Sequence, residues 1–424
     1  KRSVVLVDGV RTPFLTSGSD YQNLLSHDLQ RYALQGLLQR TALPVSEVDH
    51  VVVGTVIQDV NTSNIAREAA LSAGFSKHTP CHTVTMACIS SNMAVTTGAC
   101  QIAAGQSDVV VAGGVDTMSD VPIRLSRGMR KSLLAANKKK TTSGKLSTIL
   151  SGLRYFGLEL PAISEFSTNE TMGHSGDRLA ATFGISRRDQ DEYASRSHNL
   201  AHQAAEKGKL QDVLTVFAPG RSKPVTLDNG IRPSTPEQMS KLKPAFVKPH
   251  GTITAANASF LTDGASAALL MSEEKALSLG YTPKAYLKDF VYVSLDPKDQ
   301  LLLGPAYATP LLLDRSGLTP KDIDVFEYHE AFAGQILANL QAMDSDWFAQ
   351  EYMKRSSKLG RLPLEKFNTW GGSLSIGHPF GATGVRLVTT AANRLLDEDG
   401  SLAVVAACAA GGQGHALLLE RYPK

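Results

Sequence analysis

The sequence predicts an α/β protein made of two halves related by pseudo-symmetry, and three observations support this prediction. A pattern of helix end, loop and apolar strand at residues 37–53 recurs at 312–328. A helix rich in small residues followed by an apolar run occurs at 90–114 and again at 381–408. The apolar runs are continuous rather than alternating, which is typical of parallel strands covered on both faces. Chance similarity between ordinary α/β segments is the alternative.

The elements follow the same order in both repeats. Residues 37–43 and 312–318 are expected to end helices that lead into strands at 47–53 and 322–328. The helices expected at 90–104 and 381–396 precede strands at 108–114 and 402–408. Each half should therefore contain an equivalent pair of buried strands.

The length of 424 residues is suited to two or three packed units. We expect the first part of the N-terminal half at 1–120 and an insertion region at 121–250. The closing strands of the N-terminal half are expected at 251–285, and the C-terminal half at 286–424.

The composition excludes several classes of protein. A hydrophobic content of 42% and a charged content of 20% are typical of a globular protein, and a net charge of +3 is too small to indicate nucleic-acid binding. Four cysteines in so long a chain do not indicate a disulfide framework, so we interpret them as thiols in a reducing compartment. No apolar run reaches the length of roughly 18 residues that a membrane span needs. The N-terminus has no secretory apolar region, which leaves open a targeting segment that has been removed.

The insertion region has a basic segment. Residues 121–158 contain nine Lys or Arg and no Asp or Glu. Within it Leu146, Ile149, Leu150, Leu153 and Gly157 recur at helical spacing that continues to Leu160, which predicts a single basic amphipathic helix. Such a helix is suited to an anionic membrane surface. The alternative is a solvated insertion whose apolar stripe packs on the main body or on a partner.

Cys88 is the first candidate for chemistry. It lies between a strand-like run at 82–86 and a helix expected from Ser90 onward. The N–H groups and positive dipole end of that helix favour a thiolate. An inert buried thiol is the alternative interpretation.

Three further candidates lie at strand ends or glycine-rich loops. His378 lies in the segment 371–384, whose glycines let backbone N–H groups approach a ligand, although neither common phosphate-binding motif is present. Cys408 ends an apolar strand just before Gly411 and Gly412. His329 also follows an apolar strand, but position 333 is Ala rather than the second His of a zinc motif, so we expect no metal.

Together, two thiols and two imidazoles at one crevice suit carbon–carbon chemistry on thioesters. An imidazole takes the proton of one thiol, the resulting thiolate attacks a carbonyl, and the second thiol moves the proton needed at carbon.

At this point the chain resembles the thiolase family over nearly its whole length. The similar segments are 8–14, 85–91, 257–259, 263–265, 329–332 and 377–379, together with Cys408. The chain departs from the family at three positions: His329 stands where Asn is usual, Ala410 where Gly is usual, and Phe260 where Gly is usual. With the basic insertion, these variants resemble the long-chain 3-ketoacyl-CoA thiolases of mitochondrial β-oxidation.

The resemblance implies a fold of five layers, α-β-α-β-α, and a role for each residue. His378 would deprotonate Cys88, which attacks C3 of a 3-ketoacyl-CoA. His378 and His329 would stabilise the acetyl-CoA enolate, which Cys408 protonates. The backbone N–H groups of Cys88 and Ala410 would form an oxyanion hole.

The resemblance also implies ligands, partners and location. Ser259 and Met172 would contact pantetheine, coenzyme A would be a substrate, and no cofactor would be bound permanently. The subtype implies a homodimer core assembled with a hydratase/dehydrogenase α subunit, in mitochondria, peripheral on the matrix side of the inner membrane, with contact through 121–160.

Two other functions are weighed against this one. A ketoacyl synthase would use Cys88, His329 and His378 but needs no second catalytic cysteine, so Cys408 disfavours it. A non-catalytic carrier of acyl-CoA or lipid is disfavoured because Cys88, His378 and Cys408 are all present.

Overall fold

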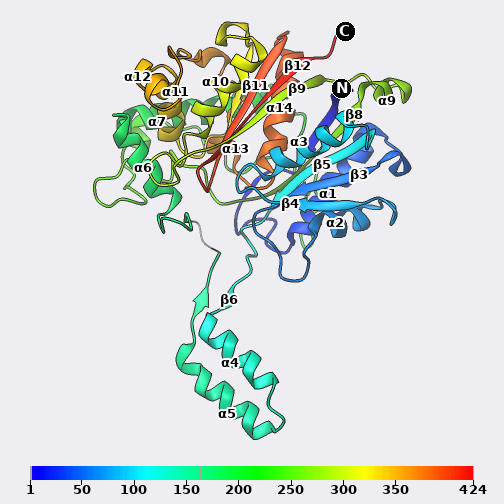
Figure 1. The fold of residues 1–424 in the computed structure, drawn as a ribbon, viewed down its shortest axis with the longest axis vertical. Coiled ribbons are helices and arrows are strands. Elements are labelled where there is room, and N and C mark those ends of the chain that lie inside the picture. Colours follow the sequence, from blue (N-terminus) through cyan, green and yellow to red (C-terminus); the bar gives the residue numbers. More distant parts are fainter. Residues whose placement is uncertain (1, 162–163, 424) are drawn as a thin grey trace.

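The computed structural model describes residues 2–161 and 164–423, and it contains the two predicted halves (Figure 1). The strands form one path in the order β10-β11-β12-β9-β1-β8-β5-β3-β4. The halves meet where β1 pairs with β9 over only two residue pairs. The N-terminal half supplies β1 (Val4–Arg11), β3 (His50–Gly54), β4 (Cys81–Val84), β5 (Val109–Asp116) and β8 (Thr262–Ser272). The C-terminal half supplies β9 (Ala285–Ser294), β10 (Val325–Tyr328), β11 (Leu402–Ala409) and β12 (Gln413–Arg421).

The predicted pseudo-symmetry is confirmed by the pairing of these strands. In the first half β3 pairs parallel with β5, which pairs antiparallel with β8, which pairs antiparallel with β1. In the second half β10, β11, β12 and β9 repeat this sequence of directions. The prediction of parallel strands is therefore right for the pairs β3–β5 and β10–β11. It is wrong for β1, β8, β9 and β12, which pair antiparallel with their neighbours. A continuous apolar run shows that both faces are buried, but it carries no information on direction.

Buried apolar side chains form a core on each side of both sheet halves, which explains the five layers. One outer core packs α1 (Ser26–Thr41) and α2 (Ile65–Ala73) on the N-terminal half. Another packs α10 (Gly304–Ser316) and α11 (Ala333–Met343) on the C-terminal half. Between them lies a core around α3 (Ser90–Ala103) and α14 (Thr383–Asp397).

The central layer depends on small residues where the halves meet. A Cβ atom at Gly114 would lie 1.8 Å from the backbone oxygen of Gly381, and one at Gly384 would lie 2.2 Å from Oδ1 of Asn92. Side chains at these glycines would push the halves apart. Glycine therefore permits the close approach that joins the layers.

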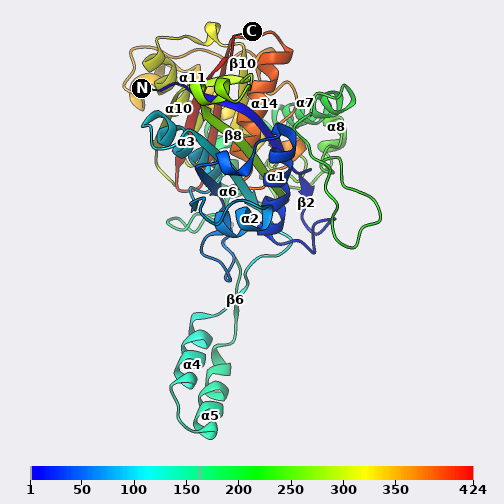
Figure 2. The ribbon, with the colours of Figure 1, turned by 90° about the vertical axis from the view of Figure 1, so that its right-hand side faces the viewer.

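The basic insertion is a helical hairpin that projects from the body in both views (Figures 1 and 2). It consists of α4 (Arg127–Asn137) and α5 (Thr142–Gly152), with β6 (Arg124–Leu125) paired to β7 (Leu158–Glu159) at its base. The prediction of one helix continuing to Leu160 is therefore wrong. The helix ends at Gly152, and a short 3-10 turn follows at Leu153–Tyr155. The projection also disfavours packing of the apolar stripe on the main body.

Other helices cover the C-terminal half or lie in connections. They are α6 (Met172–Thr182), α7 (Arg187–Glu206), α8 (Pro236–Met239), α9 (Glu273–Ser278), α12 (Asp346–Glu351) and α13 (Ser373–Ile376), with a two-residue strand β2 (Leu15–Thr16). Across 2–161 and 164–423, no helix combines the length and apolar character needed to cross a membrane. The four segment boundaries remain a prediction, and residues 1, 162, 163 and 424 within them lie outside the described residues.

Candidate active site

The four predicted side chains Cys88, His329, His378 and Cys408 line one pocket of about 440 Å³. They come from segments far apart in the sequence, and Cys88 alone belongs to the N-terminal half. The spatial arrangement expected from the sequence is therefore present.

Cys88 lies on a tight loop between β4 and α3. Ala87, the residue before it, has a φ of 46°, a left-handed conformation that is unusual for alanine. The hydroxyl of Ser90 stabilises the loop because it accepts a hydrogen bond from the N–H of Met86 at 2.8 Å and donates to the carbonyl of Ala87 at 2.7 Å. The sulfur is thereby directed toward the C-terminal half.

His378 lies on a loop that is tied to the N-terminal half. Its backbone N–H donates to Oγ1 of Thr262 at 3.0 Å. Three residues later, the N–H of Gly381 donates to the carboxylate of Asp116 at 2.6 Å. Burial raises the pKa of Asp116 to about 6, although several N–H donors and the Thr55 hydroxyl act against the rise.

His329 follows β10 directly, and the next residue holds the turn in place. The carboxylate of Glu330 accepts hydrogen bonds from three side chains and one backbone N–H. These donors are Tyr193 at 2.9 Å, Ser197 at 2.8 Å, Asn368 at 2.8 Å and the N–H of Leu374 at 3.2 Å. The fully buried Glu330 thus links β10 to the segment that carries His378.

Cys408 lies near the end of β11, just before a glycine turn. Gly411 and Gly412 have φ of 87° and 67°, which other residues rarely adopt. The N–H of Gly411 donates to the carboxylate of Glu165 at 2.6 Å. Glu165 therefore ties the turn to the segment that returns from the insertion.

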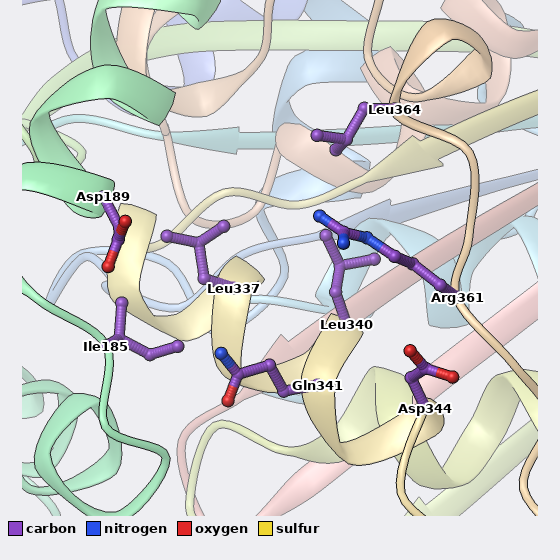
Figure 3. A pocket seen from close by; sticks show the side chains of 8 residues that line it. All are labelled: Ile185, Asp189, Leu337, Leu340, Gln341, Asp344, Arg361 and Leu364. Atoms are coloured by element: carbon purple, nitrogen blue, oxygen red, sulfur yellow. The ribbon is translucent and has the colours of Figure 1, made fainter.

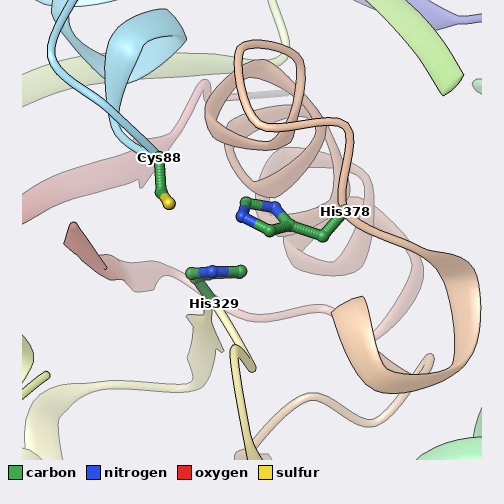
Figure 4. Close-up of side chains that lie close together, drawn as sticks. All are labelled: Cys88, His329 and His378. Atoms are coloured by element: carbon green, nitrogen blue, oxygen red, sulfur yellow. The ribbon is translucent and has the colours of Figure 1, made fainter. Parts of the chain in front are cut away.

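The sulfur of Cys88 points toward the imidazoles of His329 and His378 (Figure 4). The sulfur and one nitrogen of each ring lie within 4.8 Å of one another. The two rings are stacked, with centroids 3.9 Å apart and planes inclined by 36°. This geometry is suited to proton transfer between a thiol and an imidazole.

Two opposing effects act on the thiol of Cys88. Burial raises the pKa of its thiol to about 11, and the negative charge of Asp116 adds to the rise. Hydrogen bonds from the N–H groups of Ala410 and of Cys88 itself act in the opposite direction without offsetting burial. The N–H groups at this helix start therefore favour the thiolate, as expected, but loss of water outweighs them and the resting group is a thiol.

The other three groups are also neutral in the resting site. Burial lowers the pKa of His378 to about 3, and the nearby Arg386 charge contributes. Burial, His378 and Arg386 hold the pKa of His329 well below its ordinary value. Burial and the neighbouring Cys88 raise the pKa of Cys408, which keeps this thiol protonated.

Cys88, His329 and His378 also form a set that could hold a metal ion. One sulfur and two imidazole nitrogens are ligands that zinc accepts. The same atoms are those that a cysteine nucleophile and its bases require. Metal-independent chemistry therefore stays a prediction.

The pocket walls contain the remaining predicted residues and several that sequence reasoning missed. Met172, Ser259 and Ala410 all line it. Most of the other lining side chains are apolar, and they include Val56, Phe246, Phe260, Leu261, Leu302, Phe332 and Phe380. Among these, the sequence analysis singled out Phe260 as a departure from the resembled family, and it included Phe332 and Phe380 only as members of the segments 329–332 and 371–384. Isolated aromatic residues in connecting segments carry no sequence signal that distinguishes a pocket wall from a core.

A second pocket of about 240 Å³ lies beside α11 (Figure 3). It is lined by residues such as Ile185, Leu337 and Arg361. None of the predicted site residues lies there, so it is separate from the candidate chemistry.

Known proteins resemble this chain throughout its length. The thiolase N-terminal domain matches residues 4–274, and the thiolase C-terminal domain matches residues 281–421. The mitochondrial trifunctional enzyme subunit beta of Bos taurus is 68% identical over all of this chain and 89% of its own length. A probable 3-ketoacyl-CoA thiolase of Caenorhabditis elegans is 61% identical over all of this chain and 95% of its own length. The crystal structure of human mitochondrial 3-ketoacyl-CoA thiolase in complex with CoA superposes with a TM-score of 0.85 at 28% identity, covering 100% of this chain and 98% of the other.

Proposed function

The chain belongs to the thiolase family, and from this premise we propose how its residues carry out the reaction. It is a 3-ketoacyl-CoA thiolase of mitochondrial fatty-acid β-oxidation, an acyltransferase. The reaction cleaves a 3-ketoacyl-CoA with coenzyme A, releasing acetyl-CoA and an acyl-CoA two carbons shorter.

The first step forms a bond from the Cys88 sulfur to C3 of the substrate. His378 takes the thiol proton as the sulfur attacks, so a free thiolate does not need to persist at neutral pH. The developing negative charge passes to the ketone oxygen. The N–H groups of Cys88 and Ala410, which both face the Cys88 sulfur, are suited to receive it.

The second step breaks the C2–C3 bond and leaves acetyl-CoA as an enolate. His378 and His329 stabilise its thioester oxygen, and Cys408 gives a proton to carbon. Cys408 is suited to this role because burial keeps its thiol protonated. In the third step Cys408 takes the proton of coenzyme A, whose sulfur attacks the acyl carbon on Cys88. The bond from this carbon to the Cys88 sulfur breaks, the shortened acyl-CoA is released, and Cys88 takes back its proton from His378.

The observation that carries this proposal is the second thiol in the shared pocket. A ketoacyl synthase has no use for Cys408, and a carrier has no use for a stacked imidazole pair beside a nucleophile. Both thiols line the same pocket, and Cys88 lies near enough to contribute to the raised pKa of Cys408.

The experiment is an assay of the purified chain. We expect coenzyme A-dependent loss of 3-ketohexadecanoyl-CoA, faster than loss of acetoacetyl-CoA, because the pocket walls are apolar and the resembled subtype acts on long chains. Cys88→Ser should abolish both thiolysis and acyl trapping. Thiolysis that persists in this variant would remove Cys88 from its role, and the absence of any thiolysis in the unmodified chain would reject the function.

We also propose that Met172 and Ser259 contact the pantetheine of coenzyme A. Both line the pocket, and Met172 opens α6 while Ser259 is held by a hydrogen bond from its N–H to the carbonyl of Ala331 at 2.9 Å. Met172→Ala should raise KM for coenzyme A more than it lowers kcat. An unchanged KM would exclude the contact.

Assembly and location are proposed from the relatives and from the hairpin. The relatives' name, trifunctional enzyme subunit beta, supports a second kind of subunit as partner, which the family resemblance identifies as a hydratase/dehydrogenase α subunit. The partly buried β4, which is the last strand of the sheet and lies beside the Cys88 loop, supports a homodimer core. Light scattering of this chain alone tests the homodimer, and a monomeric mass would contradict it. Light scattering of the chain mixed with the α subunit of such an enzyme tests the assembly, and the absence of a complex would contradict that proposal.

The hairpin is further proposed to contact the matrix side of the inner membrane. Lys138, Lys139 and Lys140 are exposed at its tip, and large apolar side chains are exposed along it. These apolar residues include Leu134, Leu146, Leu150, Phe156, Leu158 and Leu160. Apolar and basic groups together are typical of segments that bind anionic lipid surfaces.

Charge reversal of Lys138, Lys139 and Lys140 to Glu should weaken sedimentation with cardiolipin-containing vesicles. The matched control changes three exposed lysines of the body, Lys207, Lys223 and Lys321, to Glu. This charge reversal should leave sedimentation with the vesicles unchanged. Equal binding by both variants would reject membrane contact. Loss of α-subunit binding without loss of vesicle binding would assign the hairpin to the partner instead.

A further inference from the structure

Each imidazole in the pocket has a hydroxyl group as partner at Nδ1. His329 Nδ1 lies 2.9 Å from Oγ of Ser373, and His378 Nδ1 lies 2.6 Å from Oγ1 of Thr383. All four side chains are buried. A neutral imidazole carries one proton, so the hydrogen bond at Nδ1 decides what Nε2 presents to the pocket.

The hydroxyl of Thr383 has two neighbours but only one proton. The carbonyl oxygen of Pro379 lies 3.0 Å from Oγ1 and can only accept. The hydroxyl proton therefore goes to Pro379, and Oγ1 accepts a hydrogen bond from Nδ1–H of His378. His378 is left with a lone pair on Nε2, which is what a base for Cys88 requires.

The hydroxyl of Ser373 is in the opposite situation. Its oxygen accepts a hydrogen bond from Nη2 of Arg386 at 3.0 Å, and a guanidinium can only donate. Among the residues that the structure describes, the only acceptor recorded for the Ser373 proton is Nδ1 of His329. His329 therefore carries its proton on Nε2 and presents an N–H group.

Arg386 is placed by other buried charges. Its Nη1 lies 3.7 Å from Oε2 of Glu327, whose other oxygen accepts a hydrogen bond from Arg394 at 2.7 Å. Burial, with a contribution from the charge of Arg386, lowers the pKa of both imidazoles and keeps them in the neutral form that the tautomers require. No protein partner is recorded for Nε2 of either histidine within 2–161 and 164–423, so both atoms are free for substrate.

We propose that Ser373, oriented by Arg386, and Thr383 fix His329 and His378 in opposite tautomers, so that one offers an N–H group and the other a lone pair. Ser373, Arg386 and Thr383 are positioning residues, because they act through the imidazoles. The N–H group of His329 is suited to the enolate oxygen, and the lone pair of His378 to the thiol proton. The catalytic roles given to His329 and His378 rest on the proposed function, whereas the positions of the protons on their rings do not.

Neutron diffraction from crystals of the deuterated full chain at neutral pH tests the proton positions without an activity assay. We expect deuterium on Nε2 of His329 and on Nδ1 of His378. Deuterium on Nδ1 of His329, or on Nε2 of His378, would overturn the proposal. Because the readout is structural, an inactive chain with the expected positions would reject the proposed function and leave this inference intact.

Two substitutions at Thr383 separate positioning from packing. Thr383→Val keeps the shape and loses the hydroxyl, whereas Thr383→Ser keeps the hydroxyl and loses a methyl group. We expect the rate of Cys88 acylation to fall about tenfold or more in Thr383→Val and to stay near the unmodified rate in Thr383→Ser. A packing role predicts the reverse order, and that result would overturn the assignment of Thr383.

Ser373→Ala tests the second half of the proposal. Without the hydroxyl, nothing obliges the His329 proton to stay on Nε2, so the neutron map should show deuterium at Nδ1 or shared between the two nitrogens. Deuterium wholly on Nε2 in this variant would show that Ser373 does not set the tautomer.

Discussion

The imidazole rings of His329 and His378 are stacked with their centroids 3.9 Å apart, and Cys88 faces both of them. Two charged imidazoles could not share this buried position, and burial holds the pKa of each below its ordinary value. The resting site is therefore a neutral thiol beside two neutral imidazoles, and the charges of the reaction arise only when substrate is present. This gives the site a pH dependence and a response to mutation that can be measured.

The alkylation rate of Cys88 should rise with pH without a plateau in the neutral range. With a thiol pKa of about 11, the thiolate fraction increases about tenfold for each pH unit between about 7 and 9. Mass spectrometry of iodoacetamide-treated protein measures this rate, and the exposed Cys100 serves as a reference in the same chain. A rate independent of pH across this range would indicate a preformed thiolate.

Cys408→Ser should separate the two half-reactions. Cys88 should still be acylated by an activated thioester, whereas exchange of the α-protons of acetyl-CoA with D₂O should fall by about 10²-fold or more. NMR of acetyl-CoA measures the exchange, and the protein mass reports acylation. Exchange at the unmodified rate would contradict the role of Cys408 as acid and base.

Removal of metal ions should leave thiolysis unchanged. The sulfur of Cys88 and the ring nitrogens of His329 and His378 must be free to react with substrate. A zinc ion held by these atoms would therefore block the nucleophile. We expect full activity after dialysis against a chelator, and inhibition by added zinc that the chelator reverses. Loss of activity on chelation, restored by zinc, would show that metal takes part.

Glu165→Ala should lower kcat, because the carboxylate holds the N–H of Gly411 and thus the turn that contains Ala410. A displacement of an oxyanion donor by about 1 Å can cost about 10²-fold in rate. Glu165→Gln keeps an accepting oxygen and is the matched control, which should retain most of the activity. Equal kcat for the Ala variant and the unmodified chain would exclude a role for this contact.

Gly114→Ala should destabilise the fold by about 3 kcal/mol or more, because the new methyl group meets the backbone of Gly381 at 1.8 Å. Gly157→Ala is the control, since its Cβ would make an ordinary contact of 3.6 Å with Ser126. Chemical denaturation measures both. Similar stability of the two variants would mean that the halves are not closely packed at Gly114.

Much of the fold could be predicted because the strands that recur in the two halves are long and apolar. The strands expected at 108–114 and 402–408 correspond to β5 and β11 within a few residues. The antiparallel strands β1, β8 and β12 could not be oriented, because burial on both faces is the same in either direction. The break between α4 and α5 did leave a signal, since Thr141 caps α5 by accepting from the N–H of Gly144.

The reactive residues of the candidate site could be predicted because few residue types carry out this kind of chemistry. Cys88, His329, His378 and Cys408 stand out because thiols and imidazoles are rare and lie beside strand ends. Glu165 and Arg386 did not stand out, because their roles depend on contacts with residues more than ten positions away. The raised pKa of Cys88 could not be predicted from the sequence, because burial depends on the whole fold.

The division of the site between the halves has a consequence for how activity depends on folding. Cys88 comes from one half, while His329, His378 and Cys408 come from the other. Neither half alone contains both the nucleophile and its base. Any loosening of the contact between the halves should therefore stop turnover before either half unfolds.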